Sequence, residues 1–439
     1  MIRLVPVLAC LLIGPALPAE AFPGAPPTIA KPSVVFVVAD DMGWRDTGFQ
    51  GSPHAKTPHL DDMAGKGVRF DYFYPGQQMC SPGRQALLTG RNPCRVGLHH
   101  LGATRPQEVT LAKALKAAGY RTAHFGKWHL GGRATSPVKM GFEEAIWKIN
   151  FFDLGARLQK NDTKKMVALE GDTSVATMKL ALEYIRKQAA AKQPFFVQVC
   201  FGSPHGPHKA AEEFKALYKD LPARQQDFYG EISGLDAAVG NLRAELKQLG
   251  IADDTLVWFT SDNGGITPQS QDPAGKGKMN VGVRTVAVLE WPARVKQPLR
   301  TSVVCGHVDM YPTVLDVAGV TVPHQPVLDG ISLVPLLDGK MRERPRPLGF
   351  LLWHGKGGFD KADFVKDTQG VWIDGRHKLI VEPEQAKKPA ALYDIHADPA
   401  HRLNLADKRP DLVKKMRQAL AEWQGSVRSS YDGKDYARP

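Results

Sequence analysis

The stretch SVVFVVA, residues Ser33–Ala39, decides the fold, and it runs directly into Asp40 and Asp41. A continuous run of β-branched and aromatic residues predicts a strand that is buried on both of its faces. Similar short apolar runs recur at residues 121–125, 195–201, 255–260 and 286–290. Strands of this kind are typical of a parallel sheet that is covered by helices on both sides.

Helical patterns lie between these predicted strands. Residues 110–118 begin with Thr110, a typical helix N-cap, and residues 173–191 and 227–249 repeat apolar side chains at helical spacing. Strands that alternate with helices predict an α/β fold with a mostly parallel central sheet flanked by helices.

The predicted secondary-structure pattern changes from about Gly339 onward. Shorter strand-like pieces follow at residues 370–373 and 378–381, and a helix is expected over residues 410–423. We therefore expect a large domain over residues 33–338 and a smaller C-terminal α+β domain over residues 339–439, with antiparallel strands and a terminal helix. A chain of 439 residues is long enough for both.

The N-terminus has the pattern of an exported protein. Residues 1–22 combine Arg3 with an apolar run and with small residues near its end, which predicts a cleaved signal peptide. A short membrane anchor is the alternative, but the apolar run is shorter than the roughly 20 residues that cross a bilayer. Residues 23–32, rich in Pro, Gly and Ala, form a linker. We expect a secreted or periplasmic protein with no integral membrane segment after signal removal.

Composition favours a globular protein with an anionic ligand. The hydrophobic fraction of 43% and charged fraction of 23% are ordinary for a folded domain, and the formal net charge of +12 is spread along the chain. Neither zinc-finger spacing nor an RNA-recognition motif is present, so we expect no nucleic-acid partner. Beyond the signal, the cysteines stand at positions too irregular for a disulfide framework or a metal site, namely Cys80, Cys94, Cys200 and Cys305.

Polar residues follow four of the predicted strands at the point where each strand ends. In chain order they are Asp40 and Asp41, Lys127 and His129, His205 and His208, and Asp262 and Asn263. Ligands of open α/β sheets bind beyond the carboxyl ends of the strands, so we expect these side chains to converge. Each pair alone also fits a turn, a cap or the start of a loop. Their recurrence at four strand ends favours a functional site.

The two acidic pairs point to a metal ion. Asp40, Asp41, Asp262 and Asn263 offer only oxygen ligands, which suit calcium, or less well magnesium, better than zinc.

One segment, CSPGRQALLTGR at residues 80–91, is highly specific. It resembles the signature of the type I sulfatases of the alkaline phosphatase superfamily, in which CxPxR opens a helix and LTGR ends the segment. Other segments of the chain match the family in the same order: DDMGW at 40–44, TPHLD at 57–61, GKWHLG at 126–131, SPH at 203–205, SDNGG at 261–265 and LYD at 392–394. The resemblance covers about residues 32–423.

The resemblance implies an alkaline-phosphatase-like fold, with residues 33–338 as the catalytic domain, and the hydrolysis of sulfate monoesters. It also implies that a separate maturation enzyme oxidises Cys80 to formylglycine, which supplies an oxygen nucleophile. A calcium ion would be held by this residue together with the four oxygen ligands at the strand ends. The implied substrate is a sulfated small molecule or, more specifically, a sulfated carbohydrate.

The resemblance also implies roles for the basic residues. Arg84 would orient the nucleophile, while Lys127 and a second lysine hold the sulfate oxygens. His205 would donate a proton to the leaving alcohol, and His129 would assist release of sulfate. The resemblance leaves two candidates for the second lysine, because the segment GKGKMNVGVR at residues 275–284 lacks a glutamate and one residue of the family's usual spacing. Lys276 is our choice, and Lys278 is the alternative.

Two other functional classes stay open from the sequence. One is a phosphate or phosphonate monoester hydrolase of the same superfamily, and the other is a non-catalytic glycan-binding relative. Neither the sulfated substrate and its linkage nor the oligomeric state follows from the sequence.

Overall fold

The computed structural model describes residues 31–152, 154–266, 276, 283–353 and 358–436. The expected signal peptide and all but the last two residues of the expected linker lie outside these ranges. None of the helices in the described ranges combines the length and the apolarity that a bilayer crossing requires.

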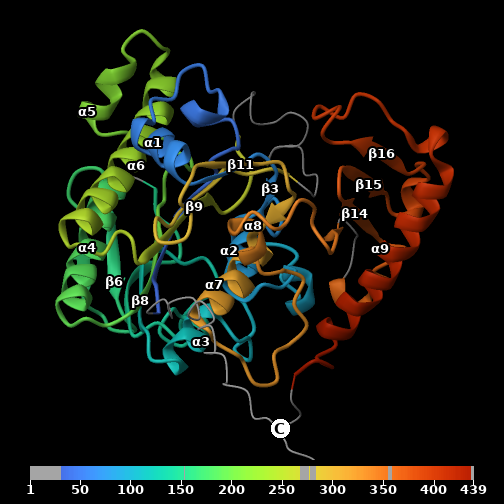
Figure 1. The fold of residues 1–439 in the computed structure, drawn as a ribbon, viewed down its shortest axis with the longest axis horizontal. Helices are drawn as coiled ribbons and strands as arrows, with labels where there is room; N and C mark the ends of the chain where they lie inside the picture. Colours follow the sequence, from blue (N-terminus) through green and yellow to red (C-terminus); the bar gives the residue numbers. More distant parts are fainter. Residues whose placement is uncertain (1–30, 153, 267–275, 277–282, 354–357, 437–439) are drawn as a thin grey trace, which may run out of the picture. The chain divides into compact units, whose positions relative to one another are not determined.

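Across the described part of the chain, a ten-stranded sheet has the order β11-β2-β10-β9-β1-β8-β4-β5-β6-β7 (Figure 1). Its middle is parallel: β1 (Ser33–Ala39) lies between β9 (Thr255–Ser261) and β8 (Phe195–Cys200), and β8 also pairs with β4 (Arg121–Lys127). The strand β10 (Ala287–Glu290) runs antiparallel to β9. The five strands expected from apolar runs are thus confirmed to within two residues.

Shorter strands extend the sheet at both edges. They are β2 (Val68–Phe70) and β11 (Leu299–Thr301) beyond β10, and β5 (Glu144–Lys148), β6 (Arg157–Lys160) and β7 (Met166–Ala168) beyond β4. The strands β6 and β7 run antiparallel to their neighbours. A separate parallel pair is formed by β3 (Phe73–Tyr74) and β12 (Cys305–Gly306).

Helices cover both faces of the large sheet, because strands such as β1 carry apolar side chains on both faces. Val34, Phe36 and Val38 point to one side, where they join a core cluster with residues of α2 (Cys80–Thr89), α3 (Leu111–Ala117) and α7 (Met310–Ala318). Val35 and Val37 point to the other side, into a cluster with α1 (Pro58–Lys66), α4 (Thr173–Ala190) and α6 (Ala223–Gln248). Successive strand residues face opposite sides, so a continuous apolar run needs helices on both. The short helices α5 (Glu212–Lys215) and α8 (Val334–Leu337) lie in connections.

The C-terminal region contains a second, four-stranded antiparallel sheet. Its order is β13 (Leu348–Trp353), β14 (Thr368–Asp374), β15 (His377–Val381) and β16 (Ala391–Asp394). The helix α9 (Pro410–Tyr431) packs Met416 and Leu420 against Trp372 and Leu379 of this sheet. The fold class expected from the sequence is confirmed: a large helix-flanked sheet and a small antiparallel one.

The helix α9 extends eight residues beyond the end expected at residue 423. Ser426 and Ser430 in this extension both accept hydrogen bonds from Nη1 of Arg95, at 3.0 and 2.9 Å, and Val427 is fully buried. Serine and glycine are weak helix formers, so the local sequence predicts an earlier end. Tertiary contacts keep these last two turns helical.

Candidate active site

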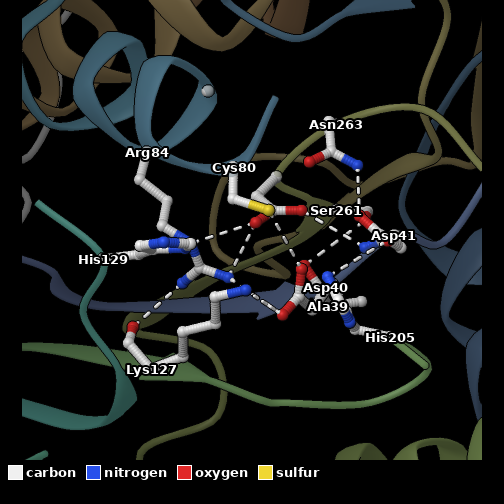
Figure 2. A network of polar contacts seen from close by, with 12 residues as sticks. Ala39, Asp40, Asp41, Cys80, Arg84, Lys127, His129, His205, Ser261 and Asn263 are labelled. Carbon is white, nitrogen blue, oxygen red and sulfur yellow. Dashed lines mark hydrogen bonds and ion pairs between the residues drawn. The ribbon is translucent and has the colours of Figure 1, made fainter. Parts of the chain in front are cut away.

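The polar residues that follow the four strands all lie on the side of the large sheet to which the carboxyl ends of its central strands point. The strands β9, β1, β8 and β4 are consecutive neighbours and run parallel, so their carboxyl ends point the same way. Figure 2 shows that side chains following these strands turn toward one another around Cys80. We call the following residues the strand-end cluster: Asp40, Asp41, Cys80, Arg84, Lys127, Asp262, Asn263 and Lys276.

Cys80 is the first residue of α2 and is 3% exposed. Its Sγ lies 3.6 Å from Oδ1 of Asp40 and 3.8 Å from Nζ of Lys276. The helix approaches the end of β9 so closely that a Cβ on Gly83 would lie 1.8 Å from the carbonyl oxygen of Asp262. The glycine in CSPGR is therefore required sterically, because a side chain at position 83 would keep α2 from placing Cys80 beside the carboxylates.

Electrostatics keep Cys80 in its thiol form. Burial raises its pKa well above the ordinary value, and the charges of Asp262 and Asp40 raise it further. A thiolate is the nucleophilic form of cysteine, and although Lys127 and Lys276 favour it, burial and the two carboxylates outweigh them. An unmodified Cys80 is therefore poorly suited to nucleophilic attack.

Arg84 is the cation at the centre of the cluster and is 1% exposed. Its Nε donates to Oδ2 of Asp262 at 3.0 Å, its Nη2 lies 2.8 Å from the same oxygen as an ion pair, and its Nη1 donates to the carbonyl oxygen of Lys127 at 2.9 Å. Burial alone would raise the pKa of Asp262, but Arg84, Lys127 and Lys276 together bring it below its ordinary value. Asp262 is thus a firmly ionised carboxylate.

Asp40 pairs with Lys127, and neither side chain is exposed. Burial, followed by the negative charge of Asp262, raises the pKa of Asp40 to about 6 even though Lys127 opposes the shift. The three carboxylates of the cluster repel one another, and the two lysines and Arg84 supply an equal number of positive charges that offset this repulsion.

Asp41 organises the other side of the cluster. Its Oδ1 accepts from Nδ2 of Asn263 at 2.7 Å and from Nζ of Lys276, and its Oδ2 lies 3.6 Å from Nε2 of His205. The backbone of Asp41 is left-handed, with φ of 65°, which is uncommon outside glycine and concentrates at functional sites.

The donor set fits a hard cation. One ligand atom each from Asp40, Asp41, Cys80 and His205 lies within 4.8 Å of the others. Oδ1 of Asn263 is buried and has no hydrogen-bond partner among the described residues, so an acceptor is left free beside three carboxylates. Carboxylate and amide oxygens grouped in this way are the ligands that calcium takes.

The histidines separate into different environments. His129 has a buried Nδ1 without a hydrogen-bond partner within the described ranges, and burial, with Lys127 and Arg84, lowers its pKa to about 3. His205 lies beside Asp41, as Figure 2 shows. His208 does not join the cluster, because its Nδ1 lies 3.6 Å from Oε2 of the buried Glu231 on α6.

Sequence reasoning missed two neighbours of these residues. The ring of Phe152 stacks on His205 with centroids 4.7 Å apart, and Ser81 donates from Oγ to the carbonyl oxygen of His129 at 2.6 Å. Phe152 follows β5, a strand that the apolar pattern did not reveal, so no strand-end signal marked it. The structure places Lys276 in the cluster, while the alternative Lys278 lies outside the described residues.

Comparisons with known proteins agree with this geometry. The family model described as Sulfatase matches residues 32–320, and the model described as N-sulphoglucosamine sulphohydrolase, C-terminal, matches residues 279–426. N-acetylgalactosamine-6-sulfatase of Canis lupus familiaris is 32% identical, over 78% of this chain and 71% of that relative. Arylsulfatase A of Bos taurus is 30% identical, over 90% of this chain and 87% of that relative. The crystal structure of Ps i-CgsB in complex with k-i-k-neocarrahexaose has the same fold, with a TM-score of 0.81 and 24% identity over 92% of this chain and 97% of that one.

Proposed function

The chain belongs to the sulfatase family and is a sulfuric ester hydrolase, and from that premise we propose that it removes sulfate from a sulfated carbohydrate with a formylglycine made from Cys80 and a bound calcium ion. The observation that carries the proposal is the position of Cys80 Sγ, 3.6 Å from Asp40 and 3.8 Å from Lys276 within the strand-end cluster. The carbohydrate substrate is supported by the names of the relatives, one of which is an N-acetylgalactosamine-6-sulfatase.

Calcium would be held by Asp40, Asp41, Asp262 and Asn263, together with residue 80. The free Oδ1 of Asn263 supports this assignment, as do the carboxylates of Asp40 and Asp41, which lie within 4.8 Å of a ligand atom of residue 80. When bound, calcium supplies Lewis-acid polarisation, and formylglycine supplies an oxygen nucleophile that a buried, protonated thiol does not.

The basic residues bind and orient the sulfate group. Lys127 and Lys276 reach the cluster from β4 and from the segment before β10, so their ammonium groups approach from two directions. Their charge stabilises the negative charge that develops on the sulfate oxygens in the transition state. Arg84, locked between Asp262 and the Lys127 carbonyl, holds its charge in place beside residue 80.

The two histidines handle protons. His205, stacked on Phe152 and partly exposed, is placed to donate a proton to the leaving alcohol. His129 has a lowered pKa, so it is neutral near pH 7 and able to accept a proton during sulfate release. The proposal thus gives opposite proton-transfer roles to two residues of the same type.

The test combines mass spectrometry of the peptide containing Cys80 with an activity screen. We expect active protein to carry the aldehyde at position 80 and to release sulfate from aryl sulfates and from sulfated sugars. Full activity with an unmodified thiol would refute the proposed nucleophile. Complete inactivity toward all sulfate esters, with position 80 converted and calcium bound, would support the non-catalytic glycan-binding alternative instead.

A further inference from the structure

One fully buried histidine, His307, contacts the helix that carries residue 80, and the proposed chemistry does not use it. His307 begins a short 3-10 helix that leads into α7. Its Nδ1 lies 3.1 Å from the carbonyl oxygen of Gly83 on α2, and its Nε2 lies 3.3 Å from Oγ1 of Thr260 on β9. The imidazole therefore connects the backbone of α2 with the strand that leads into Asp262.

The imidazole donates a hydrogen bond to α2. Burial lowers the pKa of His307 to about 4, although backbone acceptors and the charge of Asp262 oppose the shift, so the ring is neutral near pH 7. A neutral imidazole has a single N–H. The carbonyl oxygen of Gly83 can only accept, whereas the hydroxyl of Thr260 is able to donate, so this proton lies on Nδ1. The Nδ1–H group thus binds the backbone of the CSPGR segment directly.

Gly83 is the point at which α2 meets β9. A Cβ at this residue would lie 1.8 Å from the carbonyl oxygen of Asp262, so the helix backbone packs directly on the end of the strand. The side chains of Ser81 and Arg84 connect the same turn to carbonyl oxygens at the end of β4 and just beyond it. The first turn of α2 is thus held at β9 through its backbone, where His307 binds, and at β4 through two side chains.

The segment that carries His307 is itself firmly held. Asp309 is buried two residues further on, where it accepts from the backbone N of Gly306 at 2.8 Å and pairs with the buried Arg344. The ring of Phe73 packs edge-on against that of His307, with centroids 5.8 Å apart. A donor that is fixed by its own packing and hydrogen bonds defines the position of the carbonyl group that it binds.

We propose that His307 is a positioning residue for hydrolysis: its Nδ1–H group fixes the first turn of α2, and through that turn it fixes residue 80 beside the carboxylates and Lys276. The inference rests on the nucleophile proposed above and deepens it. Residue 80 and Gly83 are about one helical turn apart, so a shift of the backbone at Gly83 moves residue 80 with it. The separations that this contact maintains are 3.6 Å from Cys80 Sγ to Asp40 and 3.8 Å to Lys276.

Three substitutions at position 307 separate the hydrogen bond from the volume of the ring. The nitrogen of an asparagine side chain is as many bonds from Cα as Nδ1 of histidine, so His307→Asn keeps a donor for Gly83. In His307→Gln the nitrogen is one bond further away, as Nε2 is, and His307→Leu has no donor. For each variant we measure kcat and KM on an aryl sulfate at saturating calcium, calcium affinity, conversion of residue 80 by mass spectrometry, and urea unfolding.

We expect kcat per converted molecule to fall about 10-fold to 100-fold in His307→Gln and His307→Leu, because a displacement of about 1 Å or the loss of a supporting contact has effects of this size. His307→Asn should stay within about fivefold of the wild type, since its donor is retained. KM should change less than about threefold, because the lysines that bind sulfate are untouched. Calcium should bind more weakly in His307→Gln and His307→Leu than in His307→Asn, since residue 80 is a proposed ligand.

His124 provides the matched control. It is also a fully buried histidine, but its Nδ1 bonds to Oε1 of Gln198 on β8 at 3.1 Å rather than to α2. His124→Leu and His307→Leu should both unfold at lower urea concentration than the wild type, because each leaves a buried polar partner unpaired. We expect His124→Leu to keep kcat within about threefold of the wild type, so that lower stability alone does not explain a loss of activity.

The outcomes separate a positioning role from a packing role. If kcat followed side-chain volume, with His307→Asn the slowest variant, the positioning role would be wrong. Equal losses of kcat in His124→Leu and His307→Leu would also overturn it, as would wild-type kcat and calcium affinity in His307→Gln, which decides alone if His307→Leu does not fold. These results leave the sulfatase function standing. A converted, calcium-loaded wild type that releases sulfate from no ester would refute the proposed function, and the role of His307 with it.

Discussion

Lys276 offers the sharpest test of how the strand-end cluster binds sulfate. Its Nζ contacts Oδ1 of Asp41 and lies 3.8 Å from Sγ of Cys80, so Lys276→Ala removes a cation next to the reacting centre. Losing one donor to a developing anion costs about 2.7–4 kcal/mol, or roughly 10²–10³ in kcat. The side chain is 21% exposed, so water screens part of its charge. We therefore expect a loss near the lower end, about 100-fold in kcat.

The assay measures kcat and KM on an aryl sulfate, with calcium content and conversion of Cys80 checked in each variant. The matched control is Lys278→Ala, which removes the same charge two residues away and should stay within about threefold of the wild type, because our assignment gives this lysine no contact with the sulfate. A larger loss in Lys278→Ala than in Lys276→Ala would refute our assignment of the sulfate-binding lysine. A loss in both calcium and kcat for Lys276→Ala would show that the lysine acts on the metal site instead.

Three further predictions follow from the cluster and its support. Asp262→Ala should lose bound calcium, measured by elemental analysis of the folded protein. If the variant kept its full calcium content, Asp262 would not be a calcium ligand. The same aryl alcohol should be released faster from its sulfate than from its phosphate ester, because three carboxylates, three cationic side chains and one divalent ion leave a formal charge of only about +2, which suits a singly charged sulfate ester and gives a modest attraction for a doubly charged phosphate. Equal kcat/KM would favour the phosphatase alternative. Asp309→Asn should cost about 3–5 kcal/mol in urea unfolding, since it leaves Arg344 buried without its bidentate partner at 2.6 and 2.8 Å. Asp338→Asn, which breaks the more exposed pair with Arg294, should cost about 0–1 kcal/mol.

The sequence predicted the elements whose pattern is local. The run at residues 33–39 identified β1 because both faces of a strand covered by helices on two sides are buried, which favours consecutive apolar residues. Thr110 marked the start of α3, and its Oγ1 accepts from the backbone N of Lys113 at 3.2 Å. The sequence did not predict short edge strands such as β6 and β7, because they have too few buried residues to produce an apolar pattern.

By itself, the sequence determined that this protein has a helix-flanked sheet, a row of polar strand ends and the signature around Cys80. Only the tertiary structure decided which of those groups meet. His205 and His208 follow the same strand three residues apart, yet one lies beside Asp41 and the other against Glu231. Likewise Arg284, which precedes β10, and Lys378 of β15 are 94 positions apart, and the charge of Arg284 still contributes to the lowered pKa of Lys378. The periodicity of a helix or strand depends on residues that are close in the sequence. Contacts between distant residues depend instead on how whole helices and strands pack, and the spacing of residues along the chain does not specify that packing.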